Sequence, residues 1–129
     1  MRRYSTCFLT LLIAVGACRR VTEDTVTKIV NGPFAVEVRS EEFYNSGIHN
    51  IDVCVAASSA RDFPKNEIEC LMRGYDFSGL SIVWKSDREI EISFDCGRVS
   101  EFANYATVSR KDSLPVEFHA RLIEACKSP

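Results

Sequence analysis

Two histidines, His49 and His119, are the side chains best suited to acid–base catalysis near neutral pH. His49 lies in a segment that we expect to be a loop, and His119 falls among the polar residues of an alternating segment near the C-terminus. A Ser–His–Asp triad is assembled in space, so the sequence alone leaves it open. The chain has no G-x-S-x-G, H-E-x-x-H, phosphate-loop or dinucleotide-binding motif. We expect both histidines to be surface residues, no catalytic residue and no cofactor, and therefore a protein that is not an enzyme.

Cysteine chemistry is better represented, with six cysteines in 129 residues. Four of them, Cys54, Cys70, Cys96 and Cys126, lie in the part of the chain that we expect to fold, at separations of 16, 26 and 30 positions. An even number in an exported domain predicts disulfides, with three possible connectivities. A zinc site is disfavoured because no C-x-x-C pair is present. We favour the sequential pairing of Cys54 with Cys70 and Cys96 with Cys126, because both loops are short enough to close readily.

The N-terminal segment has the layout of a secretory signal peptide. Arg2 and Arg3 provide a positive start, the uncharged apolar run Phe8–Ala17 follows, and small residues precede Cys18. The stretch Val15-Gly16-Ala17-Cys18 resembles the lipobox of bacterial lipoproteins. This resemblance implies cleavage after residue 17, acylation of the Cys18 thiol, and loss of Cys7 with the leader.

Two other interpretations of this segment are open. A transmembrane helix needs roughly 20 apolar residues, whereas Phe8–Ala17 has 10 and is followed by Arg19 and Arg20. Ordinary secretory cleavage would instead leave Cys18 as a free or disulfide-bonded cysteine. In the lipoproteins that the chain resembles, an Asp after the cysteine argues for retention at the inner membrane. Arg19-Arg20 in that place favours the periplasmic face of the outer membrane, if the organism is Gram-negative.

Removal of residues 1–17 would leave 112 residues, the size of one domain. This part contains 14 basic and 18 acidic residues, and the basic residues are scattered. Because no positive stripe is present, we do not expect nucleic acid as a partner. The expected partners are the membrane, through acyl chains on Cys18, and another protein of the envelope.

Alternation of apolar and polar residues dominates the chain from Val26 onward. A period of two predicts strands with one face in a core and one in water. Turn residues separate the alternating segments, as in Asn31-Gly32-Pro33 and Asn45-Ser46-Gly47. The apolar positions of the expected strands are Phe34, Val36 and Val38; Ile51, Val53 and Val55; Ile68, Cys70 and Met72; Ile90, Ile92 and Phe94; and a β-rich segment at 80–85 with Trp84.

The predicted fold class is all-β, an antiparallel sandwich or open barrel of about 7–8 short strands. Residues 1–17 are the expected signal peptide, residues 18–25 a lipid-anchored tether, and residues 26–129 a single domain. The C-terminal segment is ambiguous, because Leu114, Phe118 and Leu122 recur at helical spacing while the residues from 116 to 122 also alternate. We favour a strand there, because Pro115 suits a strand start.

The stretch from Ser81 to Glu124 is similar to small β-rich bacterial lipoproteins in which a Trp-containing strand, a polar turn and an Ile-x-Ile-x-Phe strand precede a closing strand. That similarity implies no activity. Four aromatic residues have two interpretations, namely Tyr75, Phe77, Phe102 and Tyr105. We favour a place in the core, as is usual in a small sandwich, and a binding surface is the alternative. We expect a lipid-anchored envelope protein with a non-catalytic binding domain. The alternative is a small hydrolase or ligand carrier, which would gain support if the two histidines met an acidic residue and a serine in one cleft.

Overall fold

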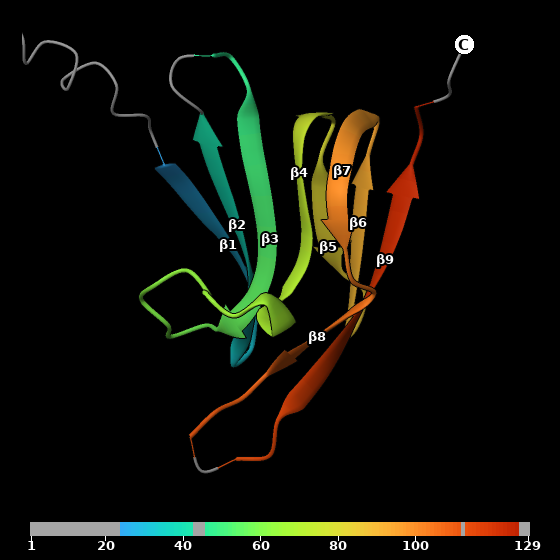
Figure 1. The fold of residues 1–129 in the computed structure, drawn as a ribbon. Coiled ribbons are helices and arrows are strands. Elements are labelled where there is room, and N and C mark those ends of the chain that lie inside the picture. The colour runs from blue at the N-terminus through green and yellow to red at the C-terminus, as the bar shows by residue number, and fades with distance from the viewer. Residues whose placement is uncertain (1–23, 43–45, 112, 127–129) are drawn as a thin grey trace, which may run out of the picture.

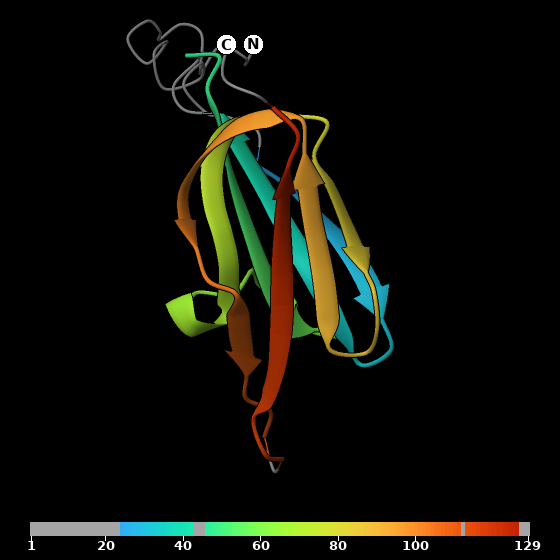
Figure 2. The same ribbon diagram turned by 90° about the vertical axis from the view of Figure 1, so that its right-hand side faces the viewer.

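A computed structural model describes residues 24–42, 46–111 and 113–126 of this chain. The expected signal peptide, Cys18 and most of the tether lie outside these residues. The described part folds as two β-sheets that pack face to face (Figures 1 and 2). Its elements are the strands β1 (Asp24–Asn31), β2 (Phe34–Glu42), β3 (His49–Ala57), β4 (Cys70–Ser78), β5 (Ser81–Trp84), β6 (Glu89–Phe94), β7 (Cys96–Phe102), β8 (Tyr105–Val108) and β9 (Val116–Glu124), and the short 3-10 helix η1 (Glu67–Glu69).

The first sheet, which we call sheet A, has the order β1-β2-β3-β4-β7, and all of its neighbouring strands are antiparallel. The second, sheet B, has the order β5-β6-β9-β8. Here β9 lies between β6 and β8 (Figure 2), and its pairing with β6 is parallel. The fold is therefore an all-β sandwich that is not closed into a barrel. The predicted all-β fold class is confirmed; the described residues form nine strands, and one of their pairings is parallel.

The core lies between the two sheets and is formed by the apolar positions of the alternating segments. Phe118 of β9 is completely buried, and its ring meets the rings of Phe34 from sheet A and Trp84 from sheet B at centroid distances of 4.8 and 5.8 Å. The Trp84 indole also donates a hydrogen bond of 2.8 Å to the Ile29 carbonyl oxygen, which joins β5 to the edge strand β1. Other residues of this core are Val36, Val53, Val55, Leu71, Met72, Ile90, Ile92, Ala106 and Val108.

Both sequentially paired disulfides are present. Cys54–Cys70 links the adjacent strands β3 and β4, and Cys96–Cys126 joins the start of β7 in sheet A to the residues that follow β9 in sheet B. The predicted connectivity is confirmed. The two bridges have different roles, because the first closes the loop between β3 and β4 and the second links the two sheets covalently.

The loop between β3 and β4, residues 58–69, folds back over the outer face of sheet A, and we call it the strap. The Lys28 ammonium donates a hydrogen bond of 2.5 Å to the Ala60 carbonyl, and the Arg39 guanidinium lies 4.7 Å from the centre of the Phe63 ring. The strap explains why polar positions of the strand pattern are buried: Glu37 is only 1% exposed and Asp52 only 8%.

Two boundaries differ from the sequence prediction. β1 begins at Asp24, so Asp24 and Thr25, expected in the tether, belong to the first strand. Ile68, expected to point into the core from a strand, lies in η1 and is 63% exposed, because β4 begins only at Cys70. The C-terminal segment is the strand β9, as favoured.

Candidate functional site

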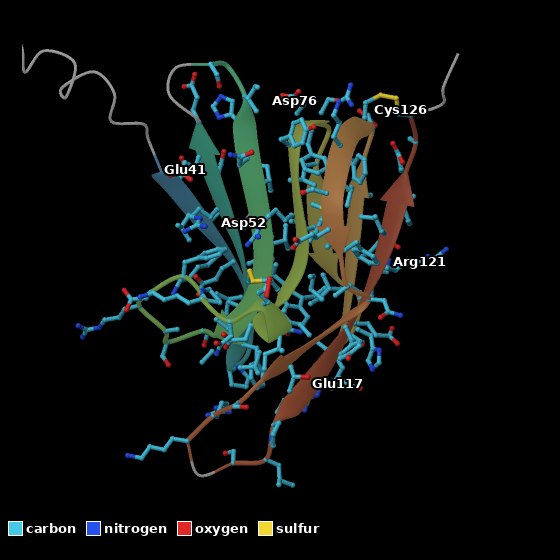
Figure 3. All side chains as sticks on the ribbon, in the orientation of Figure 1. Glu41, Asp52, Asp76, Glu117, Arg121 and Cys126 are labelled. Carbon is cyan, nitrogen blue, oxygen red and sulfur yellow. A yellow bond between two sulfur atoms is a disulfide. The ribbon has the colours of Figure 1, made fainter. Side chains whose placement is uncertain are left out.

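The two ends of the sandwich are formed by different turns, loops and strand ends. β1 starts at one end, which also carries Cys126 (Figure 3), and the turns β1–β2 and β5–β6 and the loop β8–β9 lie at the opposite end (Figure 1). We call this opposite end the far end. Because it is built by connections from both sheets, residues that are distant in the sequence meet there.

A hollow of about 390 Å³ lies at the far end, and we call it the far-end hollow. The β1–β2 turn and the β5–β6 turn are fixed to each other, since the side-chain amide of Asn31 donates a hydrogen bond of 3.3 Å to the Ser86 carbonyl oxygen. The third wall is the β8–β9 loop, in which the Ser113 amide donates to the Arg110 carbonyl at 3.2 Å. The lining residues are Asn31, Gly32, Pro33, Phe34, Asp87, Arg88, Arg110, Ser113 and Val116.

Two arginines dominate the electrostatics of this hollow. Arg88 and Arg110 lie over the same Phe34 ring, with guanidinium carbons 5.9 and 5.5 Å from its centroid, and Arg88 is also 5.6 Å from the centroid of Phe118. Guanidinium groups are attracted to the negative faces of aromatic rings. Both rings are anchored in the core, so they hold two positive charges at the mouth of the sandwich.

The loop next to this hollow exposes an apolar side chain. Leu114 is 85% exposed, and it lies in the β8–β9 loop, which projects beyond the body of the sandwich (Figure 1). A single exposed leucine is ordinary by itself, but this one follows directly on Ser113 and lies in the same loop as Arg110, both of which line the hollow. The far end can therefore offer a partner both an apolar and a cationic contact.

The outer face of sheet A carries a second cluster of charges, in which four residues occupy directly opposite positions on neighbouring strands. These are Arg39, Asp52, Arg73 and Glu101, from β2, β3, β4 and β7. Asp52 accepts hydrogen bonds of 2.7 and 2.8 Å from the two guanidinium groups, and Arg73 lies 3.7 Å from Glu101. The hydrogen bond and charge of Asp52 raise the pKa of Arg73. The charges alternate in sign and pair with one another, so the row links four strands of sheet A, and Arg39 also contacts Phe63 of the strap. Among the described residues the buried Arg39 Nε has no hydrogen-bond partner.

Glu37 lies under the strap, two residues before Arg39 on the same face of β2. Burial raises the pKa of its carboxyl group, and the opposing effect of Lys28, whose ammonium lies 3.6 Å from Oε2, is smaller. The neighbouring positions across the sheet are Cys54 and Cys70. This group is sealed beneath the disulfide-closed strap, which makes it a stability element rather than a site for ligands.

The two histidines are far apart. His49 starts β3 in sheet A, and His119 lies near the start of β9 in sheet B, at the opposite end of the sandwich. Both are exposed, as expected. His119 Nε2 is 3.1 Å from the Glu117 carboxylate on the outer face of sheet B (Figure 3). The histidines therefore do not meet in one cleft.

His49 does share a hollow with a serine and an acidic residue. Ser40, His49 and Asp76 line a space of about 490 Å³ at the end where β1 starts, and Asp76 is visible there in Figure 3. Asp76 has a left-handed backbone conformation, with φ of 58°. Within the described part of the chain, however, no hydrogen bond joins these three side chains. A nucleophile and its base need contacts of about 2.6–3.2 Å, so the three residues do not form a triad in this structure.

The four candidate aromatic residues do not form one surface. Phe77 packs against Phe94 in an edge-to-face contact of 4.9 Å, and a Cβ atom at Gly97 would overlap its ring. Tyr75 and Phe102 lie in sheet A, whereas Tyr105 is 53% exposed in sheet B. The hypothesis of a single aromatic patch at these residues is therefore wrong.

Sequence reasoning missed Arg88 and Arg110. They are 22 positions apart, and each looks like an ordinary solvated residue of a turn. No pattern in the sequence marks them, because the β1–β2 turn, the β5–β6 turn and the β8–β9 loop come together only once the strands of both sheets are placed.

Among the residues that the structure describes, no group of three or more His, Cys, Asp or Glu side chains is arranged to hold a metal ion. The described residues also contain no helix with the length and apolar character needed to cross a bilayer. Comparisons with protein-family models, curated proteins and solved structures gave no match.

Proposed function

We propose that this chain is a lipid-anchored protein of the bacterial cell envelope, and that its β domain binds another envelope component without catalysing a reaction. The anchor is Cys18, on the strength of the charged start, apolar run and small residues that precede it. Two or three acyl chains on one cysteine hold a protein at a membrane stably, whereas a single chain is marginal.

The observation that carries the binding role is the position of the far-end hollow. Only five residues separate Cys18 from the start of β1 at Asp24, a distance of at most roughly 22 Å for an extended chain. The two ends of the sandwich are about 30 Å apart, because β2 runs between them with nine residues. An anchored domain would therefore keep the start of β1 close to the bilayer and direct the far-end hollow and Leu114 away from it.

The anchor is tested directly by mass spectrometry of the protein purified from its own membranes. We expect a diacylated or triacylated N-terminal peptide that begins at Cys18, and we expect Cys18→Ala to leave the precursor uncleaved or to release the domain. An unmodified N-terminus at residue 18, or an intact leader in the membrane-bound protein, would contradict the anchor.

The binding role is tested by site-specific photo-crosslinking in intact cells. A photoreactive residue in place of Leu114 should give a discrete adduct, because that side chain is 85% exposed beside the hollow. The matched control is the same residue at Glu124, which is also exposed but lies at the other end of β9. Adducts of equal yield from both positions, or none from position 114, would overturn the assignment of the far end as the binding surface.

A small hydrolase is the second candidate, and the grouping of Ser40, His49 and Asp76 around one hollow is the observation that favours it. Its test is ester turnover by the purified domain, with Ser40→Ala and His49→Ala as separate variants. Turnover that both substitutions abolish, with folding retained, would establish the enzyme and replace the non-catalytic role.

A further inference from the structure

We propose that the far-end hollow binds a single carboxylate group of its partner, held between the guanidinium groups of Arg88 and Arg110. This inference rests on the proposed binding role and adds the chemistry of the ligand. The arginines of this domain have two kinds of contact, with a carboxylate or with a phenylalanine ring.

Arg39 and Arg73 are each hydrogen-bonded to Asp52, so their charges are compensated within the domain. Arg88 and Arg110 instead rest on phenylalanine rings, and with the carboxylates of the described residues they form no ion pair within 4.0 Å. A phenylalanine ring attracts a cation but accepts no conventional hydrogen bond. Both arginines are exposed, and Arg88 donates one hydrogen bond of 3.2 Å to the Asp87 carbonyl oxygen. The contacts with the rings therefore leave most of the five N–H donors of each guanidinium group available.

The guanidinium carbons of Arg88 and Arg110 both lie within 6 Å of one ring centroid, so their like charges repel each other and an anion in contact with both compensates them. Phe34 is 4% exposed and Phe118 is fully buried, so the rings beneath the two arginines are fixed before any ligand arrives. Preorganised guanidinium groups bind planar oxyanions through paired, charge-assisted hydrogen bonds. The arrangement is thus that of an anion site within a chain of net negative charge.

The third charged residue of the hollow, Asp87, selects among anions. Among the described residues that line the hollow, the charged groups are two arginines and one aspartate, with a net charge of +1. A carboxylate compensates this charge, whereas a phosphate dianion exceeds it and meets repulsion from Asp87. Ser113 and Asn31 provide further polar groups, and Pro33 and Val116 provide apolar contact for the carbon atoms next to the carboxylate.

The experiment is an NMR titration of the purified domain, observing the arginine Nε–H resonances. The probes are N-acetylalanine, which has a chain-terminal carboxylate, and N-acetylaspartic acid α-amide, whose single carboxylate is on the side chain, so the two sources can be told apart. N-acetylalaninamide is the uncharged control, and inorganic phosphate tests the selectivity. We expect saturable shifts of Arg88 and Arg110 with at least one carboxylate probe, none with the amide, and at least tenfold weaker binding of phosphate.

The variants Arg88→Gln and Arg110→Gln should each weaken carboxylate binding about tenfold, the loss expected for one charge-assisted interaction. Arg98→Gln is the matched control, because Arg98 is an exposed arginine of β7. Equal melting temperatures establish that the variants are folded. Unchanged affinity in both far-end variants, or equal shifts at Arg98, would overturn the carboxylate site. If crosslinking from position 114 persists in Arg88→Gln/Arg110→Gln, the binding role stands and only the ligand chemistry fails.

Discussion

Replacing Phe118 with alanine removes the side chain at which the two sheets meet. Its ring is fully buried and makes edge-to-face contacts with Phe34 and Trp84 at 4.8 and 5.8 Å. Truncation of a buried phenylalanine costs about 3–5 kcal/mol, and each aromatic pair contributes about 0.5–1.5 kcal/mol beyond its buried area. We therefore expect a loss near the upper limit, about 5 kcal/mol.

This loss is large against the total stability of a domain of about 100 residues, which is about 5–15 kcal/mol. It corresponds to a fall in melting temperature of about 20 °C or more, at about 4–8 °C for each kcal/mol. The variant should be only marginally folded at 25 °C. It should also bind carboxylate probes more weakly, because Arg88 loses one of the two rings on which it rests.

Urea unfolding followed by tryptophan fluorescence measures this effect, because Trp84 is the single tryptophan of the chain and its ring contacts that of Phe118. The control is His119→Ala, the next residue of β9, whose side chain is 60% exposed. Surface substitutions of this kind change the free energy of unfolding by no more than about 0.5 kcal/mol. A loss below about 1 kcal/mol for Phe118→Ala, with an unchanged denaturant slope, would refute the central place of Phe118 in the core.

Three further outcomes are expected. Burial raises the pKa of Glu37, so its contribution to stability is fully present below the unfolded value of about 4.5 and is lost as the pH rises through the folded pKa. Urea midpoints at several pH values should therefore show that Glu37→Gln becomes more stable relative to the wild type between acid and neutral pH. A stability difference that does not change with pH would contradict this sign. Cys54→Ala/Cys70→Ala should cost about 3 kcal/mol, because the bridge closes a loop of 16 residues, and limited proteolysis should then cut the strap before any other segment; cleavage elsewhere first would show that other contacts hold it. Asp52→Ala should cost about 1–3 kcal/mol because it leaves Arg39 and Arg73 without their acceptor, and Asp52→Asn should recover part of this in the same unfolding assay, whereas equal losses would argue that charge alone matters.

Alternation in the sequence predicted the strands that bury one face in the core and expose the other to solvent. β2, β3, β6 and β9 alternate clearly because one face of each lies in the core, and β9 was recognised despite its competing helical spacing. The pairing of the four cysteines followed from loop length. β7 escaped prediction because as an edge strand it buries little, and its exposed positions carry no strong pattern.

The candidate site was harder to predict for a reason of geometry. The apolar rings that hold Arg88 and Arg110 come from Phe34 and Phe118, so four separate segments must be placed before the two charges can be seen together. The burial of Glu37 was also hidden, because its place on the polar side of β2 predicts solvent exposure. Only the strap, which has no periodic pattern, reverses that expectation.

The position of β9 inside sheet B also determines the order in which the molecule can fold. The last of the described strands, β9, pairs with both β6 and β8, so before it is available sheet B exists only as the β5–β6 hairpin and an unpaired β8. Sheet A can assemble earlier, because β1 to β4 pair in the order of the chain and β7 follows. A chain delivered from its N-terminus therefore remains half-assembled, with most of the inner face of sheet A uncovered, until β9 emerges. Loss of β9 would leave only the β5–β6 hairpin paired in sheet B, and such a chain would be an aggregation-prone half-sandwich.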